Sequence, residues 1–381
     1  MARTSSIFLA AALLLALVFN VHAWGVEGHG AVAAIAQAYL TPKAKAAVDQ
    51  IIGQSGTFKA YLDVASWPDN IRNQRKETSD WHYIDAEDDP APPARKCGPV
   101  RFPQDCGADE SCIITAVAGA VKALVPGQAP VKVARDGINN QAEALAFLTH
   151  FAGDIAQPLH TTGYKVGANN VLVNFEGKSV KLHAAWDGTL IRKMLSTQYA
   201  GSQDKWVADL IARAAKTDVR QIPGLKCAAT VNPLDVDGTE ACAMEWASDS
   251  NTFVCSTVFP ADFKEGMEIS GDYYQNSIEP INNQIVKGGL RLAAVLNKVL
   301  GGADPASTTT TSAATSTATT SSTAVATTTS AGSTATTTAA PTTTATATGA
   351  PQPAPGKCTT LATVKIVTTA TVVVTTTIGG Y

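Results

Sequence analysis

The spacing of histidine and aspartate constrains the fold of this chain more than any other feature. His150 and Asp154 are four residues apart, and so are His183 and Asp187. On a helix, residues four apart project from one face, so each pair could grip one metal ion. One pair alone could be an ordinary helical hydrogen bond. Two pairs near three further histidines favour helices that converge on zinc, which takes imidazole and carboxylate ligands. The further histidines are His29, His82 and His160.

The first 23 residues are typical of a secretion signal. Arg3 supplies a positive start, residues 7–19 form an apolar core too short for a comfortable membrane span, and residues 21–23 form a small-residue cleavage site. We therefore expect a secreted, extracellular protein whose mature chain begins at Trp24. A free α-amine has a pKa of about 7.7 to 8.0, so the new terminus could bind zinc near neutral pH. The alternative for Trp24 is an ordinary buried aromatic residue.

Composition divides the rest of the chain into three parts. Residues 24–300 are long enough for one domain with a substantial core. Residues 301–357 are rich in threonine, serine and alanine, which cannot bury enough apolar area to fold, so we expect a stalk or linker. It could carry O-linked glycan and tether the protein to a cell wall or surface. Residues 358–381 have strand character but no firm role; a glycolipid anchor signal is one interpretation, which Lys365 weakens.

Six of the seven cysteines lie within residues 24–300. An even number in an exported chain, with no short CxxC spacing, favours disulfides over metal ligation. Six cysteines allow fifteen pairings, and their positions alone do not choose among them. They are Cys97, Cys106, Cys112, Cys227, Cys242 and Cys255, and Cys358 is left over in the tail.

The net charge of −3 argues against a protein that coats duplex nucleic acid, because the chain has no global basic field. Any affinity for nucleic acid must come from local groups and bound metal. The sequence also lacks an Asn-x-Ser/Thr sequon, so N-glycosylation is not expected.

Apolar periodicity predicts an all-α domain with minor β structure. Leu145, Leu148, Ala152 and Ile155 recur at helical spacing around His150. Two further segments, at residues 207–214 and 292–296, show the same period. Residues 171–175 and 180–182 flank Glu-Gly-Lys and predict a small hairpin that leads into His183.

Two further motifs, at residues 66–72 and 81–85, complete the set of candidate site residues. Asp69 and His82 are candidate ligands. Arg72, one helical turn after Asp69, could place a guanidinium beside a phosphate, although a lone arginine is more often a surface ion pair. Tyr83 offers a stacking face and Asp85 an acceptor for a base edge, whereas the plainer interpretation makes them core filler and a helix cap.

With these motifs in place, the chain resembles the trinuclear-zinc single-strand-specific nucleases and 3′-nucleotidases of the mung-bean-nuclease type. That family shares its helical fold with the bacterial zinc phospholipases C. The resemblance covers residues 24 to about 300, from the Trp-Gly start through Ser-Trp-Pro-Asp, His-Tyr-Ile-Asp, His-x3-Asp-x5-His and Leu-His-x2-Trp-Asp to the segment at 288–297. It implies hydrolysis of single-stranded DNA and RNA to products with 5′-phosphates, and of 3′-nucleotides, with no stable protein partner and a monomeric chain.

The resemblance also implies roles for individual residues. Arg72 would match the transition-state arginine, Asp69 would act in catalysis as well as in metal binding, Tyr83 would stack on the base and Asp85 would read it. Three zinc ions per chain are implied: one held by Asp69, His82, His150 and Asp154; one by His160, His183 and Asp187; one by Trp24, through its amine and carbonyl, with His29 and Asp154. The implied disulfides are Cys97 with Cys255, Cys106 with Cys112, and Cys227 with Cys242.

Two other functions compete with this interpretation. A zinc phospholipase C would use the same metals on a lipid headgroup, but the bacterial enzymes typically place Glu where this chain has Asp187, and Tyr83 with Asp85 suits a nucleobase better. A non-catalytic zinc-binding surface protein would make the stalk the functional part, and it predicts no phosphate release from 3′-AMP.

Overall fold

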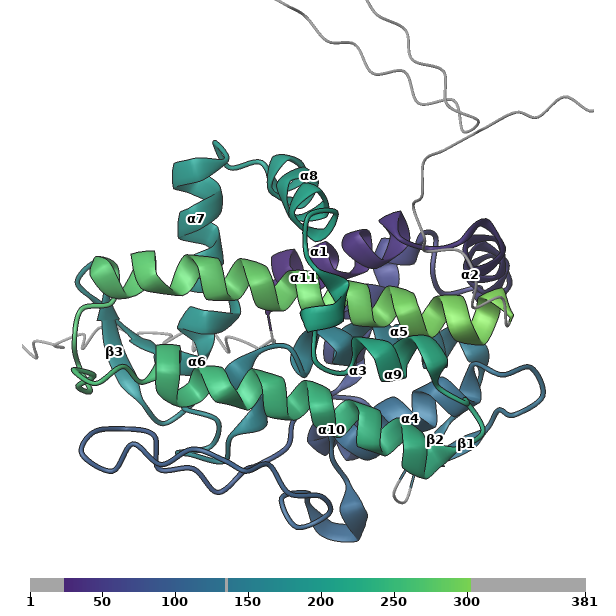
Figure 1. Cartoon of the computed structure of the whole chain (residues 1–381), viewed down its shortest axis with the longest axis horizontal. Coiled ribbons are helices and arrows are strands. Elements are labelled where there is room, and N and C mark those ends of the chain that lie inside the picture. The colour runs from purple at the N-terminus through teal and green to yellow at the C-terminus, as the bar shows by residue number, and fades with distance from the viewer. Residues whose placement is uncertain (1–23, 134–135, 303–381) are drawn as a thin grey trace, which may run out of the picture. The chain divides into compact units, whose positions relative to one another are not determined.

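The structure is a computed structural model that describes residues 24–133 and 136–302. The predicted signal segment, most of the predicted stalk and the C-terminal segment lie outside the described residues. Helices dominate the described part and its strands form two short hairpins, which confirms the predicted all-α fold with minor β structure (Figure 1). Within these ranges, no helix combines the length and the apolar character needed to cross a membrane.

The α-helices are α1 (Gly25–Ala38), α2 (Pro42–Ser55), α3 (Trp67–Ile71), α4 (Ile113–Ala123), α5 (Gln141–Asp154), α6 (Leu182–Ala184), α7 (Leu190–Gln198), α8 (Gln203–Ala214), α9 (Leu225–Thr230), α10 (Val236–Phe253) and α11 (Asp272–Gly301). Shorter turns of other helix types are η1 (Tyr61–Ser66), η2 (Lys76–His82), η3 (Ala108–Glu110), η4 (Pro158–Thr161), η5 (Ala185–Thr189), η6 (Val219–Gln221) and η7 (Val254–Val258). The strands are β1 (Val131–Val133), β2 (Asp136–Ile138), β3 (Leu172–Phe175) and β4 (Lys178–Lys181).

The long helix α11 organises the core by packing closely on α1 and α5 (Figure 1). Two adjacent glycines allow this approach. A Cβ on Gly288 would lie 2.8 Å from the Ala152 carbonyl oxygen of α5, and one on Gly289 would lie 2.6 Å from the Ile35 side chain of α1. Larger residues would force the helices apart. The glycines therefore fix the distance between the two helices that carry His29, His150 and Asp154.

The predicted helix around His150 is confirmed as α5. It begins after Asn140, whose side-chain oxygen accepts a hydrogen bond from the Glu143 amide at 2.9 Å, a common N-cap arrangement. All residues from Ala144 to Asp154 are buried, so this helix runs through the core rather than along the surface. The two other periodic segments fall in α8 and α11.

The predicted hairpin before His183 is confirmed as β3 and β4, with Phe175 opposite Lys178. The turn is formed by Glu176 and Gly177, which have positive φ values of 51° and 74°, as a tight two-residue turn requires. A second hairpin, in which β1 pairs with β2, was not predicted. The chain passes directly from β4 into α6 and η5, which carry His183 and Asp187.

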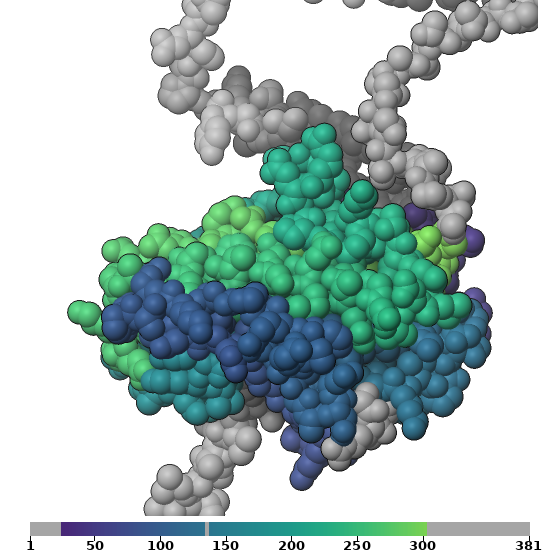
Figure 2. Space-filling view, turned by 60° about the horizontal axis from the view of Figure 1, so that its bottom comes forward, coloured from purple at the N-terminus to yellow at the C-terminus, as the bar shows by residue number. Residues whose placement is uncertain are grey.

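A long loop between η2 and α4, residues 83–112, lies across α10, as the blue band over green in Figure 2 shows. A disulfide joins Cys97 of this loop to Cys255 in η7, and Asn251 of α10 donates a hydrogen bond to Asp88 at 2.8 Å. Two further disulfides join Cys106 to Cys112 and Cys227 to Cys242. These three pairs are the ones that the family resemblance implies.

Candidate metal centre and substrate groove

The first ligand cluster forms where α3, η2 and α5 meet. Asp69, His82 and His150 are buried, and their ligand atoms lie within 4.8 Å of one another. The His82 Nδ1 atom is 3.2 Å from the Nε2 atom of His150, and both face Asp154 Oδ2, at 2.9 and 3.3 Å. Two imidazole nitrogens that point at each other and at one carboxylate surround a common point, which is the arrangement a metal ion needs.

A second cluster shares the same helix. His29 of α1 stacks on His150 with ring centroids 3.8 Å apart, and its Nε2 atom lies 3.2 Å from Asp154 Oδ1. The two oxygens of Asp154 therefore face different sets of histidines. The carboxylate lies between the first cluster and His29, as a bridging ligand would.

Trp24 is fully buried at the start of α1, and its carbonyl oxygen accepts the first helical hydrogen bond from the Gly28 amide at 2.9 Å. The residues that precede Trp24 lie outside the described part of the chain. Its role as an amine ligand therefore stays a prediction. Trp24 is the N-cap residue of α1, the helix that carries His29.

The third cluster consists of His160 in η4, His183 in α6 and Asp187 in η5, all buried. The His183 Nε2 atom is 3.3 Å from Asp187 Oδ2, and the rings of His160 and His183 have centroids 4.9 Å apart. The predicted four-residue spacing thus brings His183 and Asp187 together, although the chain passes there from an α-turn into the wider π-helical turn η5.

Backbone carbonyls orient three of the histidine rings. The Nδ1 atoms of His150, His160 and His183 bond to the carbonyl oxygens of Ala65, His82 and Gly167, at 2.7, 2.7 and 2.5 Å. A nitrogen that faces a carbonyl must carry the proton, so each Nε2 atom keeps a lone pair directed into its cluster. Such carbonyl partners are a regular feature of zinc-bound histidine.

The residues present fit metal ions because buried polar atoms converge there without hydrogen bonds. Among the described residues, the buried atoms that lack a hydrogen bond include both Asp69 oxygens, Asp154 Oδ1, Asp187 Oδ2, His160 Nε2 and both His29 nitrogens. An unsatisfied buried polar group is costly, and so many in one place require a compensating ligand. Imidazole and carboxylate donors with no thiolate suit zinc.

Electrostatics favours the metal-binding protonation state of His150, His183 and Asp154. Burial lowers the pKa of His150 and of His183 to about 3, so both rings are neutral. Burial opposes ionisation of Asp154, but His150, His29 and His82 outweigh it and hold its pKa well below the ordinary value. Asp187 differs, because burial raises its pKa well above the ordinary value. A bound cation would be needed to keep this carboxylate ionised.

Arg72, Tyr83 and Asp85 line a cavity of about 170 Å³ together with His82, His160 and His183. Arg72 ends α3, and its Nη1 atom lies 3.7 Å from Asp69 Oδ1. The Tyr83 hydroxyl donates a hydrogen bond to Asp80 Oδ1 at 2.8 Å, which restrains the orientation of the ring. Burial, with Asp80 and Asp105 nearby, raises the pKa of Asp85 to about 6. The lining of the cavity thus combines ligand histidines, a guanidinium, an aromatic ring and a carboxylate.

Sequence reasoning missed two residues of this site. Gln157 is fully buried and donates a hydrogen bond to Asp187 Oδ1 at 2.8 Å, while its own oxygen accepts from the Leu159 amide at 2.6 Å. It thereby leaves Asp187 Oδ2 to face His183. Asn169 lines the same cavity as Tyr83 and Asp85. The position of Gln157 between Asp154 and His160 is a signal that could have identified it, whereas Asn169 carries none.

Comparison with known proteins identifies the family of this chain. The family model described as S1/P1 Nuclease matches residues 24–301. Nuclease P1 of Penicillium citrinum is 34% identical over 286 residues, which cover 73% of this chain and 98% of the relative. Nuclease S1 of Aspergillus oryzae is 32% identical, and the match covers 76% of this chain and 96% of the relative. Endonuclease 4 of Arabidopsis thaliana is 29% identical, and the match covers 75% of this chain and 92% of the relative. This chain therefore belongs to the S1/P1 nuclease family and is a zinc-dependent, phosphodiester-hydrolysing nuclease.

Proposed function

We propose that this nuclease is a single-strand-specific endonuclease that cleaves DNA and RNA to 5′-phosphate products and also releases phosphate from 3′-nucleotides. The observation that carries the proposal is the cavity of about 170 Å³ that joins ligand histidines to Arg72, Tyr83 and Asp85. If a phosphate bound beside the metal cluster, the nucleoside attached to it would lie within reach of Tyr83 and Asp85. The same pocket would then serve the internal phosphodiester of a strand and the terminal phosphate of a 3′-nucleotide.

We assign three zinc ions to the clusters. Bound zinc lowers the pKa of a ligand water to about 7 and offsets the negative charge of phosphate. The first cluster would hold one ion through Asp69, His82, His150 and Asp154. The second would hold one through Trp24, His29 and Asp154, and the third one through His160, His183 and Asp187. The shared position of Asp154 between His29 and His82 supports the bridging role that this assignment gives it.

The protein's own residues would orient the substrate and stabilise the developing charge. Arg72 can donate to a phosphate oxygen, and Asp69, 3.7 Å away, holds the guanidinium near the clusters. Tyr83 can stack on the base, and Asp85 can accept hydrogen bonds from its edge when ionised. A base must leave its helical stack to enter this pocket, which costs a duplex a few kcal/mol and a single strand much less. This difference accounts for the proposed strand preference.

We also propose that the enzyme is secreted as a monomer. The three disulfides suit an oxidising compartment, and removal of residues 1–23 would expose Trp24 as the terminus. The stalk at 301–357 would carry O-linked glycan and hold the enzyme near a wall or surface.

The proposal is tested with secreted chain that begins at Trp24. We expect about three zinc per chain by elemental analysis, cleavage of a single-stranded oligonucleotide, slow cleavage of the matched duplex, and phosphate release from 3′-AMP. A chelator should abolish all three activities, and Asp69→Asn should reduce them strongly. Equal rates on duplex and single strand would contradict the strand preference. Release of diacylglycerol from phosphatidylcholine without cleavage of DNA would replace the proposal with a phospholipase.

The role of the terminus is tested separately. A chain with one alanine added before Trp24 would present an amide in place of the amine, so it should hold about one zinc fewer and lose most of its activity. Removal of the added residue by an aminopeptidase should restore both. Full activity and zinc content in the extended chain would contradict the role of the amine.

A further inference from the structure

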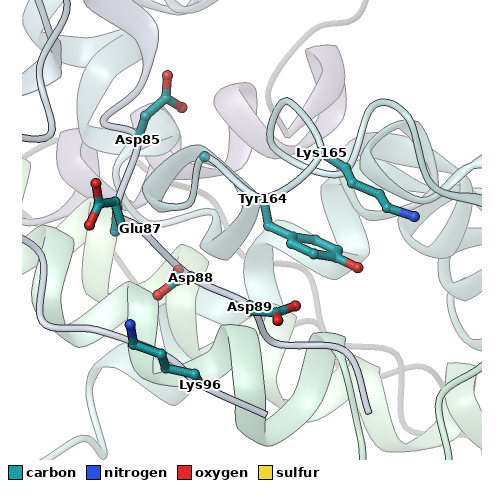
Figure 3. Close-up of a pocket in the computed structure, with 9 residues that line it drawn as sticks. Asp85, Glu87, Asp88, Asp89, Lys96, Tyr164 and Lys165 are labelled. Atoms are coloured by element: carbon teal, nitrogen blue, oxygen red, sulfur yellow. The ribbon is translucent and has the colours of Figure 1, made fainter. Parts of the chain in front are cut away.

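A second cavity adjoins the cavity that Arg72, Tyr83 and Asp85 line. Its volume is about 450 Å³, and Asp85 lines both cavities (Figure 3). The walls come from two segments, residues 85–89 and 163–165, and Lys96 also lines the cavity. A ligand that extends past Asp85 from the metal centre would therefore enter this cavity.

Each wall segment begins three residues after a metal-ligand residue, the first after His82 and the second after His160. The Ile84 amide donates to the His160 carbonyl oxygen at 2.9 Å, which joins the two chains just before the segments begin. Further along, the Gly163 amide donates to the Ala86 carbonyl oxygen at 2.9 Å. A Cβ on Gly163 would lie 3.2 Å from the Asp85 Cβ atom, so the segments are closely packed. The second cavity is thus held rigidly relative to the clusters.

Tyr164 provides the aromatic surface of this cavity. Its ring packs edge-to-face on Phe259 with centroids 5.4 Å apart, and the Lys165 ammonium lies 5.7 Å from the ring centroid. In Figure 3 the ring faces the segment that carries Asp88 and Asp89. A half-buried aromatic ring held in this way offers a stacking platform at little entropic cost.

The charged side chains that line the cavity determine which ligands it can bind. Four carboxylates face two lysines, so a phosphate inside would be repelled. Asp88 is occupied by the Gly98 amide and Asn251, and Glu87 pairs with Arg101 at 2.9 Å. Within the described part of the chain, the carboxylates of Asp85 and Asp89 have no hydrogen bond or ion pair. They can accept hydrogen bonds from the amino and imino groups of a neutral ring.

We infer that this cavity is a subsite for the base of the nucleotide on the 5′ side of the one bound at Tyr83, and that Tyr164 stacks on that base. The inference rests on the proposed function, because it needs a strand whose phosphate lies at the metal centre. Guanine, adenine and cytosine carry an exocyclic amino group from which Asp89 can accept, while Asp85 serves the base at Tyr83. Thymine has no amino group and offers only its single imino donor. The subsite should therefore favour an amino-bearing base, and an abasic position should not benefit from it.

The test uses the zinc-loaded mature enzyme and three substrates that end in deoxyadenosine 3′-phosphate. One is the mononucleotide; the other two carry guanine or an abasic residue on the 5′ side, joined by an uncleavable methylphosphonate. Phosphate release measures kcat/KM for each. We expect the guanine substrate to exceed the abasic one about tenfold, the factor that about 1.4 kcal/mol of stacking gives. Tyr164→Ala should remove this ratio, and Tyr164→Phe, the matched control, should keep it.

The outcomes separate the subsite from the proposed function. Unchanged release from the mononucleotide in Tyr164→Ala would show that the variant is folded, so loss of the ratio alone would support the subsite. Equal kcat/KM for guanine and abasic substrates in the wild-type enzyme, or a ratio that survives Tyr164→Ala, would overturn it. No release from the mononucleotide by the wild-type enzyme would overturn the proposed 3′-nucleotidase and the subsite with it.

Discussion

At the scale of residues, the site depends on groups that orient the ligands as much as on the ligands themselves. The Nδ1 atoms of His150, His160 and His183 are committed to backbone carbonyls. Gln157 orients Asp187 by donating a single hydrogen bond to its carboxylate at 2.8 Å. Because backbone carbonyls cannot be removed by substitution, Gln157 is the orienting group that mutation can test.

Replacement of Gln157 should weaken the third cluster. Gln157→Leu leaves Asp187 Oδ1 buried without its donor, and loss of such an orienting partner typically costs about 10- to 100-fold in metal affinity. We expect one zinc per chain to be lost at chelator concentrations that leave the wild-type protein fully loaded, as measured by elemental analysis after dialysis. Gln221→Leu, a surface substitution, is the matched control. Equal zinc retention in Gln157→Leu and wild type would contradict the positioning role.

The raised pKa of Asp85, about 6, predicts a pH-dependent preference between substrates. Above pH 6 the carboxylate is ionised and accepts from guanine; as the pH falls through 6 it is protonated and loses that ability. The KM for 3′-GMP should therefore rise at low pH relative to the KM for ribose 3-phosphate, which lacks a base and reports the effects of pH on the metal centre. In Asp85→Asn the ratio of the two KM values should be independent of pH. If the ratio of the two KM values still changed near pH 6 in Asp85→Asn, the titrating group would be a residue other than Asp85.

At the scale of elements, the sequence predicted the helix that carries His150 and Asp154 and the hairpin before His183. Helical periodicity and the four-residue spacing are local signals, so they identified α5 and brought His183 close to Asp187. The hairpin of β1 and β2 has only three residues in each strand, too few for alternation to stand out. The π-helical turn η5 leaves no periodic signature, because a single wider turn keeps the same residues on nearly the same face.

A buried charge network that the sequence did not reveal joins α11 to α10. Arg291 of α11 is fully buried and lies 2.6 Å from Asp249 of α10, which also holds Lys287 at 2.8 Å. The Arg291 side chain also donates to the Pro223 carbonyl oxygen at 2.9 Å. The residues are 42 positions apart, so no local pattern connects them.

Asp249→Asn should destabilise the fold strongly, because it leaves the buried Arg291 without a counter-charge. Breaking such a pair from one side costs about 3 to 5 kcal/mol. Asp209→Asn is the matched control. Asp209 pairs with Arg213 at the surface, and the two side chains are 41% and 35% exposed. Loss of this pair should lower the free energy of unfolding by less than about 1 kcal/mol. Urea unfolding at fixed free zinc measures both. Similar losses in the two variants would show that the network is not what fastens α11 to α10.

At the scale of the whole molecule, the site is assembled from segments between residues 24 and 187, and the elements that follow hold them in place. α11 fixes α1 against α5 through its two glycines. α10 and η7 hold the loop that carries Tyr83 and Asp85, through Asn251 and the Cys97–Cys255 disulfide. Sequence motifs revealed the candidate ligands. They could not reveal which later elements hold the ligand-bearing segments in place, because those contacts join residues more than 100 positions apart.

The disulfides should differ in their contribution to stability because they close loops of different length. Cys97 and Cys255 are 158 residues apart, whereas Cys106 and Cys112 are 6 apart. On chain-entropy grounds, paired alanine substitutions should lower the free energy of unfolding by about 5 kcal/mol for the long loop and about 2 kcal/mol for the short one. Denaturant unfolding at fixed free zinc measures the two losses. The long-loop variant should also release the loop from α10, so KM for 3′-GMP should rise more than in the short-loop variant. If the two variants lost equal stability and kept equal KM, the loop would be held to α10 by its noncovalent contacts, with the Asn251 side chain as the next group to replace.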